Sequence, residues 1–196
     1  MVWPASVGAF TWVQVRHFDA QQHTNGDETI NLGEVDGGVV KQTAIYPGTF
    51  DPITLGHVDV VRRGLKMFDR VVIGVADNPA KGPMFDVETR LAMVREAFAG
   101  EEHIEAVRFS GLLVDLAHSH QAVAILRGLR AASDFEYEFQ MATMNRRLDE
   151  RIETVFVMAR EDYTFVSSRF IREISSMGGD VSELVPAVVI PYLSAK

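Results

Sequence analysis

Basic and hydroxyl side chains gather in four short segments, each of which comes after an apolar run. They are Pro47–His57 (PGTFDPITLGH), Asn78–Phe85 (NPAKGPMF), Leu126–Arg130 (LRGLR) and Tyr163–Arg169 (YTFVSSR). Guanidinium and ammonium groups, hydroxyls and backbone N–H groups at helix starts are the usual ligands of phosphate in proteins. The residue types in these four segments therefore favour the binding of a phosphorylated ligand.

The first of these segments combines glycines with a histidine at the expected start of a helix. Gly48 and Gly56 allow the backbone to approach a ligand closely, and His57 lies where the helix dipole favours an anion. A tight strand–helix connection with a capping histidine would give the same pattern. The segment matches neither the GxxxxGK[ST] phosphate loop nor the GxGxxG dinucleotide motif, so both of those nucleotide sites are excluded here.

The other three segments supply positive charge and hydroxyls. Lys81 lies between two prolines, and Arg127 and Arg130 flank a glycine directly after an apolar strand. Arginine remains charged at any working pH and donates in a planar fork that suits phosphate oxygens. Ser167 offers a hydroxyl to a phosphate chain, or caps the helix that follows it. Any one of these features is weak evidence for a binding site. Four segments that each follow a strand and carry such groups together indicate one anionic ligand.

The elements that must position these residues follow from the hydrophobic pattern. Short apolar runs predict buried strands. They are Thr43–Tyr46, Arg70–Val75, Ile104–Phe109, Val123–Leu126 and Thr154–Val157. Amphipathic stretches between them predict helices. Strands that alternate with helices predict an α/β fold with a doubly wound parallel sheet, in which ligands bind beyond the carboxyl ends of the strands.

Several local signals predict where the helices begin and end. Val58, Val61, Leu65 and Phe68 fall on one helical face. Asp86 is expected to cap a helix through Leu91, Val94 and Phe98. Ser133 and Glu136 form a capping-box pattern, which predicts a helix that opens at Ser133 and carries Phe135, Phe139 and Ala142 on one side. Gly178 and Gly179 are expected to end a helix that begins near Ser167.

Composition narrows the possible classes of function. The 196 residues include 47% hydrophobic and 23% charged residues and no cysteine, which excludes disulfides, cysteine-ligated metals and a thiol nucleophile. The net charge of −8 lacks the basic excess of a nucleic-acid-binding protein. No apolar run approaches the roughly 20 residues that span a bilayer, and no secretory signal is present, so we expect no membrane partner and a cytoplasmic location.

The first 39 residues differ from the rest of the chain in hydrophobic pattern and composition. They show no sustained period of 2 or 3.6, they are polar and glycine-rich from Gln21 to Gly38, and they hold both tryptophans. We therefore expect residues 1–39 to be a disordered or dispensable extension, with the natural start of translation at Val39 or Val40, and residues 40–196 to form a single domain.

From Thr43 to about Leu193 the sequence closely resembles the bacterial phosphopantetheine adenylyltransferases, members of the Thr/His-x-Gly-His nucleotidyltransferase superfamily. The matching segments are Ala44–Thr54 with Gly56-His57, Lys81 with Pro83–Phe85, Arg127–Ala131, Asp134–Glu138 and Ser167-Ser168. The Gly-His element marks only the superfamily, whereas the Arg-Gly-Leu-Arg and Asp-Phe-Glu-Tyr-Glu segments are specific to this family.

The resemblance implies a Rossmann-like five-stranded parallel sheet and a reversible transfer of AMP from ATP to 4′-phosphopantetheine in coenzyme A biosynthesis. It also implies Mg²⁺ without a dedicated protein metal site, a homohexamer, and feedback binding of coenzyme A. The catalytic residues that it implies are His57, Thr49, Lys81 and Arg130. The implied phosphopantetheine ligands are Thr49, Lys81, Leu113 and Arg127. The implied ATP ligands are Thr49, Phe50, His57, Gly128, Leu129, Arg130, Glu138, Tyr163, Thr164, Phe165, Val166, Ser167, Ser168 and Arg169. Tyr163 and Arg169 depart from the family pattern, which more often has tryptophan and a small residue at these positions.

Two other functions remain open from the sequence. A sister transferase that acts on nicotinate mononucleotide or glycerol 3-phosphate would share the Gly-His loop but is not expected to carry the Arg-Gly-Leu-Arg segment. A non-catalytic nucleotide sensor could use the same fold, because fold alone does not prove activity.

Overall fold

The computed structural model describes residues 41–78 and 82–194, all of which belong to one compact unit, Val39–Lys196. The prediction for residues 1–39 lies outside these described residues, and so does the prediction for Lys81.

Five parallel strands form one sheet: β1 (Thr43–Gly48), β2 (Arg70–Ala76), β3 (Ile104–Phe109), β4 (Ala122–Leu129) and β5 (Glu153–Met158). Their order in the sheet is β3-β2-β1-β4-β5, and every neighbouring pair is parallel. The order reverses between β1 and β4, so the loops that follow these two strands diverge to opposite faces of the sheet and leave a crevice there. The predicted doubly wound, Rossmann-like α/β fold is confirmed.

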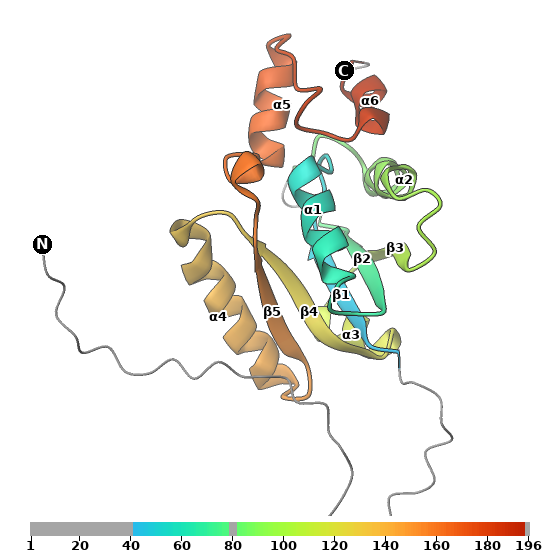
Figure 1. Ribbon diagram of the computed structural model, residues 1–196, viewed down its shortest axis with the longest axis vertical. Coiled ribbons are helices and arrows are strands. Elements are labelled where there is room, and N and C mark those ends of the chain that lie inside the picture. Colours follow the sequence, from blue (N-terminus) through green and yellow to red (C-terminus); the bar gives the residue numbers. More distant parts are fainter. Residues whose placement is uncertain (1–40, 79–81, 195–196) are drawn as a thin grey trace, which may run out of the picture. The chain divides into compact units, whose positions relative to one another are not determined.

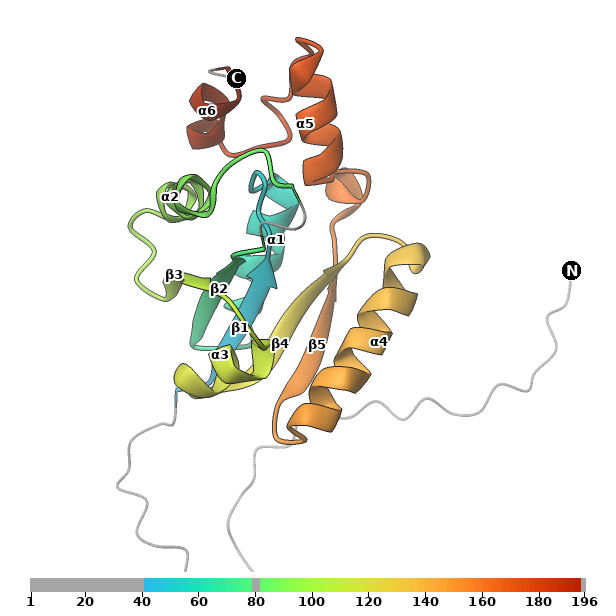
Figure 2. The same cartoon turned by 180° about the vertical axis from the view of Figure 1, so that it is seen from behind.

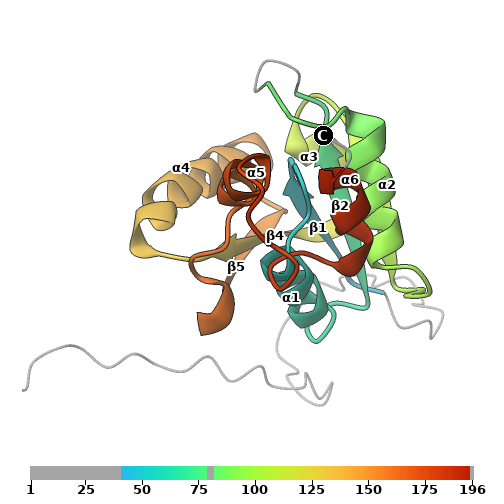
Figure 3. The same ribbon diagram turned by 90° about the horizontal axis from the view of Figure 1, so that it is seen from above.

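Helices cover both faces of the sheet. The helices α1 (Leu55–Gly64) and α2 (Val87–Ala97) lie on one face, and α3 (Leu113–Ser119) and α4 (Ala132–Leu148) lie on the other (Figures 1 and 2). Beyond the carboxyl ends of the strands lie a 3₁₀ turn (Glu161–Tyr163), α5 (Ser168–Ser176), a second 3₁₀ turn (Ala187–Val189) and α6 (Ile190–Ser194). Seen from above, α5 and α6 extend over the end of the sheet at which the crevice opens (Figure 3).

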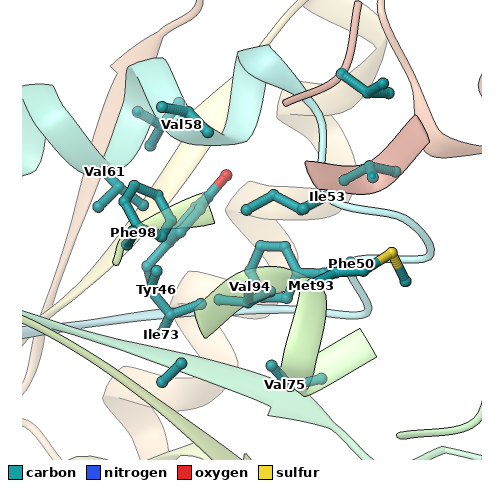
Figure 4. Close-up of a cluster of buried hydrophobic side chains, with 14 of the residues drawn as sticks. Tyr46, Phe50, Ile53, Val58, Val61, Ile73, Val75, Met93, Val94 and Phe98 are labelled. Atoms are coloured by element: carbon teal, nitrogen blue, oxygen red, sulfur yellow. The ribbon is translucent and has the colours of Figure 1, made fainter. Parts of the chain in front are cut away.

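The strands alternate their side chains between two buried layers. In β1, Ala44 and Tyr46 point into the layer under α1 and α2, whereas Ile45 points into the layer under α3. The larger layer also takes Val58 and Val61 from α1, as the helical pattern predicts (Figure 4). Both layers are apolar because a parallel sheet with helices on both faces has no solvated side.

Most of the predicted helix ends are confirmed. Asp86 caps α2, with its carboxylate accepting from the Thr89 N–H at 2.8 Å. Ser167 caps α5, and Gly178 adopts a positive φ of 77° just after that helix, where a residue without Cβ is favoured.

The predicted capping box at Ser133 is wrong. Helix α4 begins at Ala132, and its N-cap residue Ala131 makes no side-chain hydrogen bond. The side chain of Asp134 instead accepts from the side chain of Arg130 at 2.9 Å and so ties the preceding strand to the first turn. Phe135 and Phe139 are both exposed on the resulting helix.

Within the described part of the chain, none of the helices has the length and apolar character required to cross a membrane.

Candidate active site

A cavity of about 1000 Å³ opens at the carboxyl ends of β1 and β4, in the crevice that the strand order creates. It brings together most of the predicted site residues. Those that line it are Thr49, Phe50, His57, Leu113, Arg127, Gly128, Arg130, Glu138, Tyr163, Val166, Ser167, Ser168 and Arg169. Leu129, Thr164 and Phe165 do not line it: Leu129 is buried, and Phe165 is 64% exposed. All four polar segments of the sequence contribute to the lining, the second of them through Pro83.

His57 is held at the start of α1 by a reciprocal cap with Thr54. The Thr54 hydroxyl accepts from the His57 N–H at 3.4 Å, and Nδ1 of His57 accepts from the Thr54 backbone N–H at 3.0 Å. A backbone N–H can only donate, so Nδ1 carries no proton. The neutral ring must then carry its proton on Nε2, which makes His57 a hydrogen-bond donor on the side of the ring away from its cap.

The surroundings of His57 keep the ring neutral. Burial lowers the pKa of His57 to about 4, and the nearby positive charges of Arg130 and Arg127 act in the same direction. Its ring packs edge-on against Phe50, with 5.1 Å between ring centroids. At neutral pH His57 is therefore an uncharged donor with a fixed orientation.

Arg127 reaches across the cavity from β4 to α4 and to β1. Its Nε donates to Glu138 at 2.6 Å, a second nitrogen donates to the other oxygen of the same carboxylate, and the third donates to the Pro47 carbonyl at 3.0 Å. Burial acts to lower the pKa of Arg127, but the hydrogen bonds and charge of Glu138 outweigh it and raise that pKa. The guanidinium is thus charged, rigidly placed and already paired.

Arg130 forms a similar but more exposed pair at the other end of the LRGLR segment. Its guanidinium donates to both oxygens of Asp134, at 2.9 and 3.2 Å, and to the Val166 carbonyl at 3.2 Å. This last bond links β4 to the segment before α5, so Arg130 couples two walls of the cavity.

Two buried polar residues shape the loops of the cavity, and the sequence did not single out either one. The Asp51 carboxylate accepts from the backbone N–H groups of Met84 and Phe85 and pairs with Arg172 at 3.1 Å. Arg90 is 1% exposed and donates to the carbonyls of Thr49, Ala76 and Phe85. Together they fasten the loop after β1 to the loop after β2. Asp51 belongs to the matched PGTFDP segment, so the resemblance could have pointed to it, whereas Arg90 lies in a helix and belongs to no motif.

The start of α5 presents donors to the cavity. The Ser167 hydroxyl accepts from the Phe170 N–H at 3.2 Å, and the Ser168 hydroxyl donates to the Pro52 carbonyl at 2.8 Å. Both serines therefore have structural roles as well. The N–H groups of Ser168 and Arg169 have no hydrogen-bond partner within the described part of the chain, as expected for the first turn of a helix.

On the side formed by α3 and α4 the cavity is mostly apolar. Its lining there comes from Phe109, Leu112, Leu113, Met141, Met144 and Leu148. One amide interrupts this surface: Asn145 is only 6% exposed, yet among described residues its side chain has no hydrogen-bond partner. The amide is open to the cavity, so a ligand bound there can form the hydrogen bonds that the protein does not supply. The sequence offered no signal for Asn145 beyond its place on a helix.

The arrangement suits the transfer of a phosphoryl or nucleotidyl group. It offers fixed cations, a neutral histidine donor and helix N–H groups around one cavity, which are the means by which proteins neutralise charge in phosphoryl transfer. His57 cannot act as a general base in the described geometry, because Nδ1 is occupied and Nε2 carries the proton.

Comparison with known proteins places the chain in a family. The model of the cytidylyltransferase-like family matches residues 45–174. The phosphopantetheine adenylyltransferase of Methylococcus capsulatus is 58% identical over 154 residues, which cover 79% of this chain and 95% of that protein. The protein of the same name from an Anaeromyxobacter species is 52% identical over 157 residues, covering 80% and 96%.

A solved structure agrees with the fold. It is a putative nicotinate-nucleotide adenylyltransferase from Vibrio parahaemolyticus, with a TM-score of 0.58 and 22% sequence identity, covering 76% of this chain and 96% of that one. At this identity the likeness speaks for the fold alone. The family match and the two close relatives go further: the chain belongs to the cytidylyltransferase-like family and, within it, to the phosphopantetheine adenylyltransferases.

Proposed function

We propose that this chain transfers AMP reversibly from ATP to 4′-phosphopantetheine, giving dephospho-coenzyme A and pyrophosphate. The observation that carries the proposal is the cavity, which joins a donor-rich region around His57, Arg127 and Arg130 to an apolar region with one buried amide. The first region suits phosphates, and the second suits a long acceptor of low charge.

The proposed reaction requires no general base. The attacking group is a phosphate oxygen of the acceptor, which is ionised at neutral pH. Attack on the α-phosphorus adds negative charge to the equatorial oxygens while pyrophosphate leaves. The Nε2–H of His57 at the start of α1 can donate to such an oxygen, and Arg127 and Arg130 supply positive charge nearby. Thr49, which also lines the cavity, and Lys81 complete the proposed set of phosphate ligands.

The apolar side of the cavity favours phosphopantetheine over the sister substrates. The pantetheine arm is a chain with two amides and several methyl and methylene groups, which suits Leu113, Met144 and the Asn145 amide. Nicotinate mononucleotide carries an aromatic carboxylate, and glycerol 3-phosphate is short and polar. Neither would use a largely apolar surface of this size.

We further propose that Mg²⁺ arrives with ATP and is held by phosphate oxygens and water. The carboxylates that line the cavity are Asp51, Asp134 and Glu138, and each is already bound to an arginine. The donor set of the described residues therefore does not fit a dedicated metal site, and Mg²⁺ would serve to shield the triphosphate.

The proposed homohexamer is supported by two exposed aromatic side chains on α4 that do not line the cavity. Phe135 and Phe139 are each about half exposed, and their rings lie 5.8 Å apart. Exposed apolar surface on this scale typically marks a contact with another protein. Light scattering on the protein as it elutes from a size-exclusion column should give the mass of six copies.

We also propose that coenzyme A inhibits the enzyme and that the reaction takes place in the cytoplasm. Coenzyme A differs from the proposed product by one phosphate, so it should occupy the same cavity and inhibit the enzyme. We place the reaction in the cytoplasm, where ATP is supplied. Inhibition by coenzyme A that is competitive with both ATP and phosphopantetheine would support a shared cavity.

A substrate panel tests the reaction itself. Purified protein with Mg²⁺ and ATP should release pyrophosphate with 4′-phosphopantetheine, and not with nicotinate mononucleotide or glycerol 3-phosphate. Pyrophosphate release with one of those two alone would favour a sister transferase. ATP binding without turnover of any acceptor would favour a nucleotide sensor.

A further inference from the structure

The hydroxyl of Tyr46 takes no part in the proposed reaction. Tyr46 lies in β1, is 5% exposed, and packs its ring against Phe50 with centroids 5.6 Å apart. Its ring lies among the buried side chains under α1 and carries the hydroxyl at the end away from the strand (Figure 4). A phenylalanine would pack equally well in such a place.

The hydroxyl has no partner within the described part of the protein and is open to the cavity. Within residues 41–78 and 82–194, the Tyr46 hydroxyl forms no hydrogen bond. A hydroxyl of a largely buried side chain that has no protein partner usually has a water or a ligand as partner. Tyr46 also lines the cavity, so a ligand can reach it.

Gly128 keeps the space around the hydroxyl open. A β-carbon on residue 128 would lie 2.9 Å from the Val60 side chain and 3.7 Å from the Tyr46 hydroxyl. Any larger residue would therefore fill the gap between β4 and α1. Glycine at this position, next to the paired Arg127, leaves room in front of the phenol.

The position of this hydroxyl favours a ribose over a phosphate. The Tyr46 ring lies 6.3 Å from the His57 ring, centroid to centroid, and His57 is the proposed donor to the α-phosphate. The ribose of a nucleotide is bonded to that phosphate through its 5′ oxygen. Ribose hydroxyls both donate and accept, as a phenol does, whereas a phosphate would compete better for the nearby arginines. Burial raises the pKa of Tyr46, so the phenol remains protonated and can donate.

We propose that the Tyr46 hydroxyl hydrogen-bonds the ribose of the bound nucleotide and thereby contributes to the preference for ribonucleotides over deoxyribonucleotides. The proposal rests on the nucleotide half of the proposed function and does not depend on the identity of the acceptor.

Calorimetric binding without acceptor tests it. ATP, 2′-deoxy-ATP and 3′-deoxy-ATP are titrated into the wild type, Tyr46→Phe and Tyr192→Phe. Tyr192 is the matched control, because its hydroxyl bonds Glu96 at 2.9 Å and it does not line the cavity. The wild type and Tyr192→Phe should bind ATP about 3- to 10-fold more tightly than one of the deoxy forms, as one neutral hydrogen bond allows. Tyr46→Phe should lose that preference, because it should bind ATP more weakly than the wild type does and should bind the deoxy form as tightly as the wild type does.

Two results would overturn the proposal: an unchanged ratio of affinities in Tyr46→Phe, or no preference in the wild type. Thermal melting without ligand adds a second readout. Tyr46→Phe should melt at or above the wild-type temperature, because the hydroxyl that it removes forms no hydrogen bond within the described protein. A lower melting temperature would mean that the hydroxyl stabilises the protein itself, against the proposal. Because these assays contain no phosphopantetheine, a failure of the proposed adenylyl transfer would appear separately, in the substrate panel.

Discussion

The Thr54 backbone N–H donates to Nδ1 of His57 across 3.0 Å, and this one bond determines what the histidine can do. It fixes the ring by the same cap that starts α1, and it leaves the proton on Nε2. A histidine placed in this way acts as a neutral donor rather than as a base. The site therefore fits a reaction in which charge is stabilised and no proton is removed.

The first prediction concerns that donor. A group that binds the transition state better than the ground state lowers the barrier, and loss of one such donor typically costs about 100- to 1,000-fold in turnover. His57→Ala should therefore fold, bind ATP within a few-fold of the wild type, and lose kcat by about that factor. The reverse reaction, from dephospho-coenzyme A and pyrophosphate, should fall equally because both directions share one transition state. If kcat survives while ATP binding collapses, His57 is only a ground-state ligand.

The second prediction concerns pH. His57 has a pKa of about 4 in the folded chain, below the value near 6.5 expected when it is unfolded. Between these two values the unfolded state binds more protons, so the free energy of unfolding should fall as the pH drops from about 6.5 to 4. His57→Asn removes the titrating ring but keeps an acceptor for the Thr54 N–H. Urea unfolding at several pH values gives the free energy of unfolding as a function of pH. That free energy should change less with pH in the variant than in the wild type. An equal pH dependence in the two proteins would contradict the lowered pKa of His57.

The third prediction separates the two roles of Arg127. Removing one partner of a buried ion pair leaves the other charge uncompensated and typically costs about 3 kcal/mol or more. Arg127→Ala should therefore unfold more easily, because the Glu138 side chain is only 13% exposed. The double variant Arg127→Met with Glu138→Leu should recover much of that stability. Its KM for phosphopantetheine should remain raised, since the proposed phosphate ligand is absent.

The comparison for that prediction is Arg130→Ala, whose side chain is 41% exposed and pairs with Asp134. We expect it to weaken ATP binding more than phosphopantetheine binding, the opposite of Arg127→Ala. Equal loss of ATP affinity in both arginine variants would refute this division between the two substrates.

The fourth prediction concerns Arg169. Of the arginines that line the cavity in the described part of the chain, Arg127, Arg130 and Arg172 are bound to carboxylates, whereas Arg169 has no ion pair. It lies in the first turn of α5, where free N–H groups also favour an anion. Arg169→Ser should weaken ATP binding several-fold and leave AMP binding unchanged, if its charge meets the outer phosphates. Lys66→Ser, which removes an exposed charge away from the cavity, is the control; an equal loss for AMP and ATP would contradict this role.

The fifth prediction tests the buried amide. Asn145→Leu keeps the size of the side chain and removes both polar atoms, so stability should hold because the amide has no hydrogen bond within the described protein to lose. Phosphopantetheine should bind about tenfold more weakly while the affinity for ATP stays unchanged. Isothermal titration with each substrate checks this, and a matching loss for ATP would show that Asn145 does not lie on the acceptor side.

The sequence by itself determined the class of fold and most of the cavity lining. Each predicted strand lies within an observed one. A strand that is buried on both faces appears in the sequence as a continuous apolar run, so it can be recognised there. Since the strands are parallel, the segments after them had to meet at one edge. Residues such as His57, Arg127 and Ser167 could therefore be expected together from their order along the chain.

Only the tertiary structure decided how those residues are paired. Glu138 lies eleven residues after Arg127, yet its carboxylate takes two of the guanidinium nitrogens, and Asp51 bonds residues more than thirty positions away. Asn145 and Tyr46 gave no sign in the sequence because each belongs to an ordinary helix or strand pattern. The reason is physical: hydrophobic periodicity reports which face of an element is buried, but the partner of a buried polar group depends on where distant elements cross.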